Sequence, residues 1–250
     1  MGRLFNDAFL STLRVALEED TSGKANNEIE HTYYAQLKDL SQLQKAAELE
    51  KQEQWELRIP QTAGFNALGG QIRIRKTEVA KREGDTPLGP ESQTSPAEYV
   101  LTVKVQGGAD GGRREASLPA SEDIFTMFKF LSGKGMVKHR YIFPVEGSDR
   151  IWEVDTFLKE DGTYSDWVKI DFEVEDLNAT VPPLPVSVDM ETIVTNAKNH
   201  MTEAEQKLVT DLYDRVFLTL NQYLKGKGET PKGVDKEGKT ADQTEANPEP

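Results

Sequence analysis

The sequence predicts an α+β fold, an antiparallel β-barrel or tunnel with flanking helices. The first observation is that charged residues occupy alternating positions in several short segments, as they would on strands whose successive side chains point to opposite faces. The second is that turn residues separate these segments, and the third is that apolar residues recur at helical spacing near both ends of the chain. The alternating segments are Gln54–Arg58, Ile72–Lys76, Tyr99–Val105, Val137–Phe143, Ile151–Phe157 and Trp167–Glu175.

Residues 1–51 are predicted to form an N-terminal helical extension. Apolar residues from Leu4 to Leu17 follow the stripe of an amphipathic helix. A second helix is expected from about Glu28 to Glu53, where Tyr33 and Leu37 begin a series of apolar residues at helical spacing. These helices would cap the sheet or bind a protein partner.

The barrel domain is predicted to span residues 52–224 and to include a helix between its strands. The glycine-rich run Gly107–Gly112 precedes a short strand around Arg114–Leu118, which indicates a hairpin. Ser121 is expected to cap the N-terminus of a helix that continues through Leu131.

The C-terminal part of this domain is predicted to be helical. Two helices are expected, at Asp189–Ala197 and Thr202–Leu224, and the second begins with a capping box formed by Thr202 and Glu205. Residues 225–250 contain almost no apolar side chain, so we expect a disordered tail.

The composition favours a globular cytoplasmic protein. The 250 residues are 36% hydrophobic and 29% charged, and no apolar run is long enough to span a bilayer. The N-terminus lacks the pattern of a signal peptide. Because the chain has no cysteine, disulfide frameworks, thiolate metal sites and cysteine nucleophiles are excluded.

The charge balance bears on the partners of the protein. A formal net charge of −13 argues against broad nucleic-acid binding, since most of the surface would repel a phosphate backbone. Basic residues nevertheless gather in some strands and carboxylates in others, and inside a barrel like charges are tolerable only with ligands or opposite charges between them. A small phosphorylated ligand is therefore the expected partner. The basic residues concerned are Arg73, Arg75, Lys104, Lys138 and Arg140.

The ordered set of strand motifs resembles the CYTH family, also called triphosphate tunnel metalloenzymes. The family's opening motif E-x-E-x-K is similar to Gln54–Arg58; its basic strands are similar to Arg73–Arg75, Thr102–Lys104 and Lys138–Tyr141; and its later acidic strands are similar to Glu153–Asp155 and Lys169–Glu173. The resemblance covers about residues 52–195. It implies an eight-stranded tunnel in which basic side chains hold a triphosphate and carboxylates bind Mg²⁺ or Mn²⁺.

The resemblance implies roles for two sets of residues and identifies no catalytic residue. The phosphate-binding set is Arg58, Arg73, Arg75, Lys104, Lys138 and Arg140. The metal-binding set is Glu56, Glu153, Asp155, Asp171 and Glu173. Carboxylate oxygens suit a hard divalent cation, and guanidinium groups match phosphate oxygens.

Three functions remain open at this point. The first is a metal-dependent phosphohydrolase that acts on a nucleoside, thiamine or inorganic triphosphate. The second is a CYTH-like protein that binds a phosphorylated ligand or nucleotide signal without turnover. The third is a structural or interaction protein. Gln54 and Lys169 stand where the family has glutamates, and both substitutions weigh for binding over catalysis.

Overall fold

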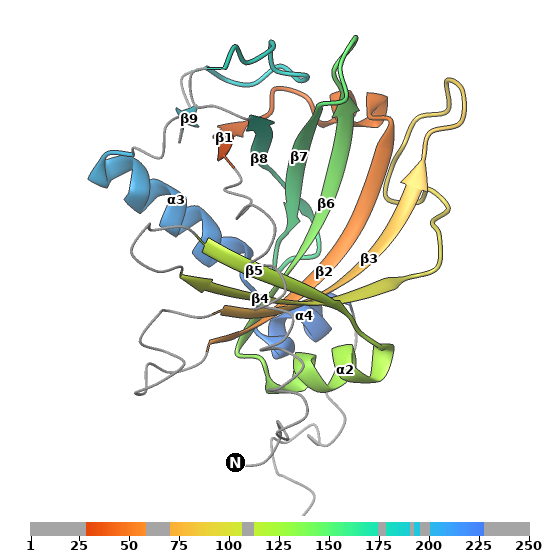
Figure 1. Ribbon diagram of the computed structural model, residues 1–250, viewed down its shortest axis with the longest axis vertical. Coiled ribbons are helices and arrows are strands. Elements are labelled where there is room, and N and C mark those ends of the chain that lie inside the picture. The colour runs from red at the N-terminus through yellow and green to blue at the C-terminus, as the bar shows by residue number, and fades with distance from the viewer. Residues whose placement is uncertain are drawn as a thin grey trace, which may run out of the picture.

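The computed structural model describes residues 29–58, 71–106, 113–174, 179–190, 193–195 and 201–227. Within these ranges the chain forms one curved sheet with helices at its margins (Figure 1). The strands are β1 (Ile29–Gln36), β2 (Glu48–Arg58), β3 (Gln71–Lys81), β4 (Glu98–Gln106), β5 (Arg113–Pro119), β6 (Lys134–Pro144), β7 (Ile151–Leu158), β8 (Tyr164–Val174) and β9 (Val194–Thr195). The helices are the 3₁₀ helix η2 (Leu40–Lys45), α2 (Glu122–Leu131), α3 (Glu203–Val216) and α4 (Leu220–Gly226).

The sheet is antiparallel, with the strand order β5-β4-β3-β2-β6-β7-β8-β1-β9. The predicted α+β class is therefore confirmed. The predicted closure is not found in the described part of the chain, where β5 and β9 form the two edges of an open sheet. Because β9 has only two residues, it offers few backbone groups for pairing with another edge. Figure 1 shows a strong bend instead, with β4 and β5 running almost across β6 and β7.

The helix predicted from Glu28 to Glu53 is wrong. Ile29–Gln36 forms β1, which pairs with β8 on one side and β9 on the other, and β2 begins at Glu48. Only Leu40–Lys45 is helical, as a short 3₁₀ segment. Ladder hydrogen bonds on both sides of β1 outweigh the local helical spacing of its apolar residues. The helix predicted within residues 1–20 lies outside the described residues.

The C-terminal helices also differ from the prediction. Val194–Thr195 pairs with β1 as β9, so these two residues are not helical. The long helix predicted at Thr202–Leu224 is two helices, α3 and α4, each with its own N-terminal capping box. α4 extends to Gly226, and the rest of the predicted tail, from 228 onward, lies outside the described residues. Among the described helices, none combines the length and the apolar character needed to cross a membrane.

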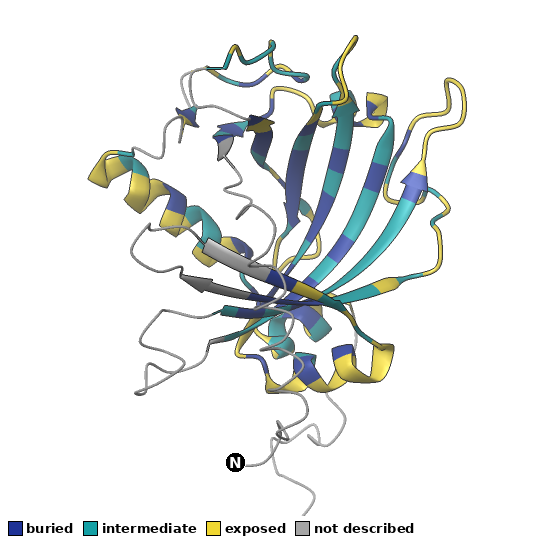
Figure 2. Ribbon diagram, viewed as in Figure 1, coloured by how far each residue is buried: buried dark blue, intermediate teal, exposed yellow. Residues whose placement is uncertain are grey.

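One face of the sheet carries two hydrophobic clusters and is called the apolar face here. Figure 2 shows that buried residues recur along the central strands of the sheet. α2 packs on it through Phe125 and Phe128, and α4 through Tyr223. A methyl group at Gly135 would lie 2.4 Å from the Trp55 ring, so only glycine allows this indole to sit against β6. The buried strand residues of this face include Leu49, Trp55, Ile72, Ile74, Leu101, Val103, Tyr141, Trp152, Val154, Val168, Ile170 and Phe172.

Candidate functional site

The strand register places the predicted site residues on the opposite face of the sheet, called the charged face here. Gln54 pairs with Arg75 and Glu56 with Arg73 across β2 and β3. Residues two positions apart on a strand share a face, so each pairing extends the same surface. The charged and amide side chains described on this face include Glu50, Gln52, Gln54, Glu56, Arg73, Arg75, Lys138, Arg140, Glu153, Asp155, Lys169, Asp171 and Glu173.

The centre of the charged face is a buried ion-pair cluster around Asp155. Arg140 donates to this carboxylate through Nε at 2.8 Å and through Nη2 at 3.1 Å, and Lys138 donates to it through Nζ. Arg140 also forms an ion pair with Glu153 through Nη1. Burial alone would raise the pKa of Asp155, but the charges and hydrogen bonds of Lys138 and Arg140 hold it well below its usual value. Asp155 is therefore ionised and fixes both basic side chains.

Arg75 lies beside this cluster with unused hydrogen-bonding capacity. Its Nε atom is buried without a hydrogen-bond partner, and no ion pair of its guanidinium is found among the described residues. Burial and the charges of Arg73 and Arg140 lower the pKa of Arg75 to about 10, whereas Asp155 and Glu50 oppose that shift. The group is still cationic at neutral pH. A partly buried cation next to other cations is an arrangement that an anion would stabilise.

The carboxylates of the charged face are engaged by polar or basic neighbours. Asp171 accepts hydrogen bonds from Thr32 at 2.8 Å and from Lys169. Glu56 accepts one from the Gln54 amide at 2.9 Å, and Glu173 is exposed near the end of β8. Within the described ranges, no group of three histidine, aspartate or glutamate side chains could hold a metal ion.

These contacts do not fit the metal site that the resemblance implies. Asp155 and Asp171 each contact a lysine, and a metal ion would have to displace or repel that ammonium group. The sequence motif correctly places these carboxylates on one face of the sheet. Their lysine partners, however, lie where a metal ion would have to bind. The Mg²⁺ or Mn²⁺ site stays a prediction, and no step below depends on it.

Two groups of the cluster have pKa values near neutrality. Burial raises the pKa of Glu153 to about 7, despite the opposing charge of Arg140. Burial also lowers the pKa of Lys138 to about 8, against the attraction of Asp155. The charge of this surface therefore changes between about pH 6 and 9.

For two members of the predicted phosphate-binding set, Arg58 and Lys104, the structure describes the backbone only. Arg58 is the last residue of β2 and pairs with Gln71. Lys104 in β4 also pairs with Gln71, from the other side of β3. These two backbone positions lie at one end of the charged face, and their side chains are outside the description.

Sequence reasoning missed the residues that β1 and α3 bring to this face. Thr32 was assigned to a helix, yet β1 places it against Asp171. Tyr213 of α3 hydrogen-bonds Tyr34 at 3.4 Å. Burial, Tyr34 and the nearby carboxylates Asp171 and Asp155 raise the pKa of Tyr213 well above its usual value. The apolar stripe of α3 indicates that this helix packs on the sheet. The stripe alone does not determine which face of the sheet the helix covers.

Solved structures with a similar arrangement of the chain were found. The fold is similar to that of a candidate adenylate cyclase from Bacillus halodurans, with a TM-score of 0.32 and 13% sequence identity, over 60% of this chain and 81% of that chain. No protein-family model and no curated protein matches the sequence.

Proposed function

We propose that the charged face binds a small phosphorylated anion and that this chain acts as a CYTH-like ligand-binding protein. The observation that carries the proposal is Arg75, a guanidinium with a buried, unsatisfied Nε that is destabilised by the charges of Arg73 and Arg140. Folding a chain into this arrangement is unfavourable unless something negative compensates it. A phosphate group supplies both negative charge and acceptor oxygens.

The neighbouring cluster would orient such a ligand. Because Asp155 holds Arg140 through two hydrogen bonds, that guanidinium loses little further freedom when an anion binds. Lys138 is 6% exposed and is held by the same carboxylate. Several fixed cations around one region favour a ligand with more than one phosphate, since each phosphate presents separate acceptor oxygens.

Hydrolysis of a triphosphate by a metal-dependent phosphohydrolase is the alternative that the sequence resemblance implies. Gln54 and Lys169, at positions where the family has glutamates, weigh against it. So do the lysine contacts of Asp155 and Asp171. Binding without turnover is therefore the function that these residues support best.

The proposal is tested by titrating the protein with sodium tripolyphosphate in a calorimeter and by assaying phosphate release in the same samples, with and without Mg²⁺. Arg75→Ala should weaken binding at least about tenfold, because a hydrogen bond to a charged group contributes roughly 1.5–3 kcal/mol. Lys76→Ala is the matched control. Lys76 is the next residue of β3, faces the other side of the sheet and contacts Glu78 at 3.3 Å.

The possible outcomes separate the alternatives. Binding that Arg75→Ala weakens, without phosphate release, supports a binding protein. Release that requires Mg²⁺ would establish the phosphohydrolase instead. Equal affinities of the wild type, Arg75→Ala and Lys76→Ala, or no binding at all, would refute an anion site on the charged face.

A further inference from the structure

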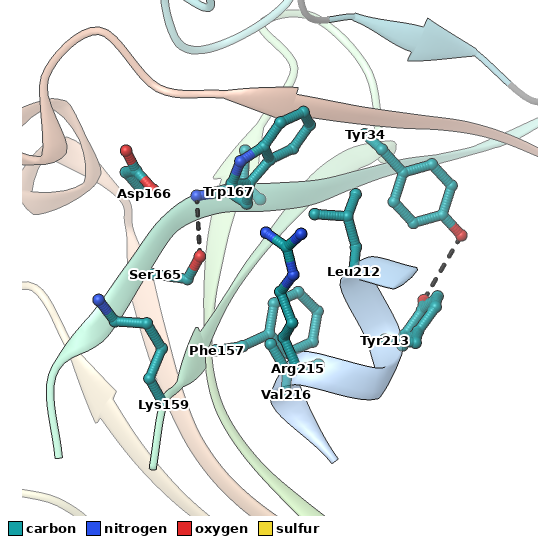
Figure 3. A pocket seen from close by; sticks show the side chains of 11 residues that line it. Tyr34, Phe157, Lys159, Ser165, Asp166, Trp167, Leu212, Tyr213, Arg215 and Val216 are labelled. Atoms are coloured by element: carbon teal, nitrogen blue, oxygen red, sulfur yellow. Dashed lines mark hydrogen bonds between the residues drawn. The ribbon is translucent and has the colours of Figure 1, made fainter. Parts of the chain in front are cut away.

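A pocket of about 240 Å³ lies between α3 and the strands β1, β7 and β8 (Figure 3). None of the residues assigned to phosphate or metal binding lines it, although it lies on the same face of the sheet, where Tyr34 pairs with Lys169 and Phe157 with Lys138. Its lining residues are Tyr34, Phe157, Lys159, Ser165, Asp166, Trp167, Val168, Leu212, Tyr213, Arg215 and Val216.

The walls of the pocket are largely aromatic. Tyr34 and Trp167 come from neighbouring strands, and Phe157 contributes a ring from β7. Tyr213 closes one side, with its ring centroid 6.0 Å from that of Tyr34 and 6.3 Å from that of Phe157. Flat aromatic side chains on several sides favour a flat aromatic guest, which can stack or make edge contacts with them.

The polar groups of the pocket carry more positive than negative charge. Lys159 and Arg215 are exposed, and Figure 3 shows the Arg215 side chain extending over the pocket toward Trp167. Asp166 is the acidic residue of the lining, and its carboxylate accepts a hydrogen bond from Gln36. Lys159 also forms an ion pair with Asp161 at 3.7 Å, so Arg215 is the cation of the lining with no ion pair among the described residues. An unpaired guanidinium at the rim favours a ligand with a negative group there.

We propose that this pocket binds a small planar aromatic anion, such as an aryl carboxylate. The volume limits the guest to one or two rings, because pockets for drug-sized ligands are about 300–1,000 Å³. The ring stacks among Trp167, Tyr34 and Phe157, and the carboxylate faces Arg215 and Lys159. The residues that would contact this ligand are different from those proposed to bind phosphate.

The experiment uses 2-naphthoate as the probe, with binding measured by calorimetry on the full chain. Trp167→Ala should weaken binding by about tenfold or more, because it removes an aromatic wall. Arg215→Gln should weaken it about threefold, because an exposed ion pair contributes little. Lys207→Gln is the matched control, since it removes one exposed charge from α3 outside the pocket.

Two comparisons decide the result. The cation 2-naphthylmethylammonium should bind more weakly than 2-naphthoate, and equal affinity for the two probes would overturn the proposed charge selection. Unchanged 2-naphthoate binding in both Trp167→Ala and Arg215→Gln, or no detectable binding, would overturn the site itself. Because Arg215 is exposed, its replacement keeps the test valid even if Trp167→Ala unfolds.

The result is also distinguishable from that of the phosphate proposal. Arg75→Ala should leave 2-naphthoate binding unchanged, and Arg215→Gln should leave tripolyphosphate binding unchanged. If each variant lost affinity for both 2-naphthoate and tripolyphosphate, the two regions would form one site, and the proposal of a distinct aromatic pocket would be overturned.

Discussion

Two clusters of partly buried charge, on opposite faces of the sheet, differ in how completely their polar groups are satisfied. On the apolar face, Glu53 accepts hydrogen bonds from Trp55 Nε1 at 2.9 Å, from Lys129 Nζ at 2.7 Å and from the Tyr223 hydroxyl at 2.7 Å. Lys129 also lies 4.0 Å from the centre of the Tyr223 ring. In this Glu53 cluster one carboxylate meets one ammonium group, and both carboxylate oxygens have donors.

In the Asp155 cluster on the charged face, Asp155 and Glu153 pair with Lys138 and Arg140, but a further cation lies beside them. Asp155 contacts two basic side chains, Lys138 and Arg140, and Arg75 stands beside them with an unsatisfied Nε. The Glu53 cluster stabilises the fold, because it joins β2 to α2 and α4. Its polar groups are already satisfied, so it has little capacity to bind a ligand. A cluster with an unsatisfied guanidinium beside it is suited to an anionic ligand. Three substitutions test this difference between the two clusters.

The largest effect is expected for Asp155→Ala. This variant leaves Lys138 and Arg140 buried next to each other without their shared carboxylate. Removing one partner from a buried ion pair costs roughly 3–5 kcal/mol, and the unfolding free energy should fall by about that amount in urea titrations. Tripolyphosphate should restore part of the loss, because it can take the place of the missing negative charge.

Asp149→Ala is the control for this substitution, because Asp149 is exposed in the turn between β6 and β7. Its stability should stay within about 0.5 kcal/mol of the wild type. An Asp155→Ala variant as stable as this control would show that Asp155 does not hold the charged face together.

A smaller effect is expected for Glu53→Gln. The amide keeps an acceptor oxygen for Lys129 but removes the charge, so the unfolding free energy should fall by about 1–3 kcal/mol. Tripolyphosphate affinity should not change, because Glu53 lies on the apolar face. Both quantities come from urea unfolding and calorimetry. A loss of tripolyphosphate affinity as large as that in Arg75→Ala would contradict the separation of the two clusters.

Much of the fold could be predicted, because alternating charged residues indicate a strand from the local sequence alone. Five of the alternating segments lie wholly within strands, and the sixth lies within β8 up to Val174, where that described range ends. Ser121 caps α2 by accepting a hydrogen bond from the Ile124 amide. β1 and β9 were missed, since their existence depends on pairing with β8 and with each other. The predicted closure of the barrel is not found among the described residues, and the sequence could not show this, because the edges of a sheet are decided by contacts between distant segments.

The candidate site was predictable in composition but not in its contacts. Period-two spacing put Arg73 with Arg75, and Glu153 with Asp155, on shared faces. It could not show that β2 separates β3 from β6, and this order brings Arg75 near Arg140. Ion pairing between β6 and β7 also neutralises carboxylates that a motif alone presents as free metal ligands.

The smallest predicted effect concerns pH and Glu153. Its pKa is raised by burial from 4.5 to about 7, so between these values the folded state binds more protons than the unfolded state. The stability that protonated Glu153 contributes is present below about pH 4.5 and is lost as pH rises through about 7. Wild-type stability should therefore fall relative to Glu153→Gln by about 1–2 kcal/mol between pH 5 and 8, measured by urea unfolding. Glu146→Gln, in the exposed β6–β7 turn, is the control and should follow the wild type. If the stability curves of Glu153→Gln and the wild type stay parallel between about pH 5 and 8, Glu153 does not titrate in this range. Its carboxyl group would then not change the charge of the charged face near neutral pH.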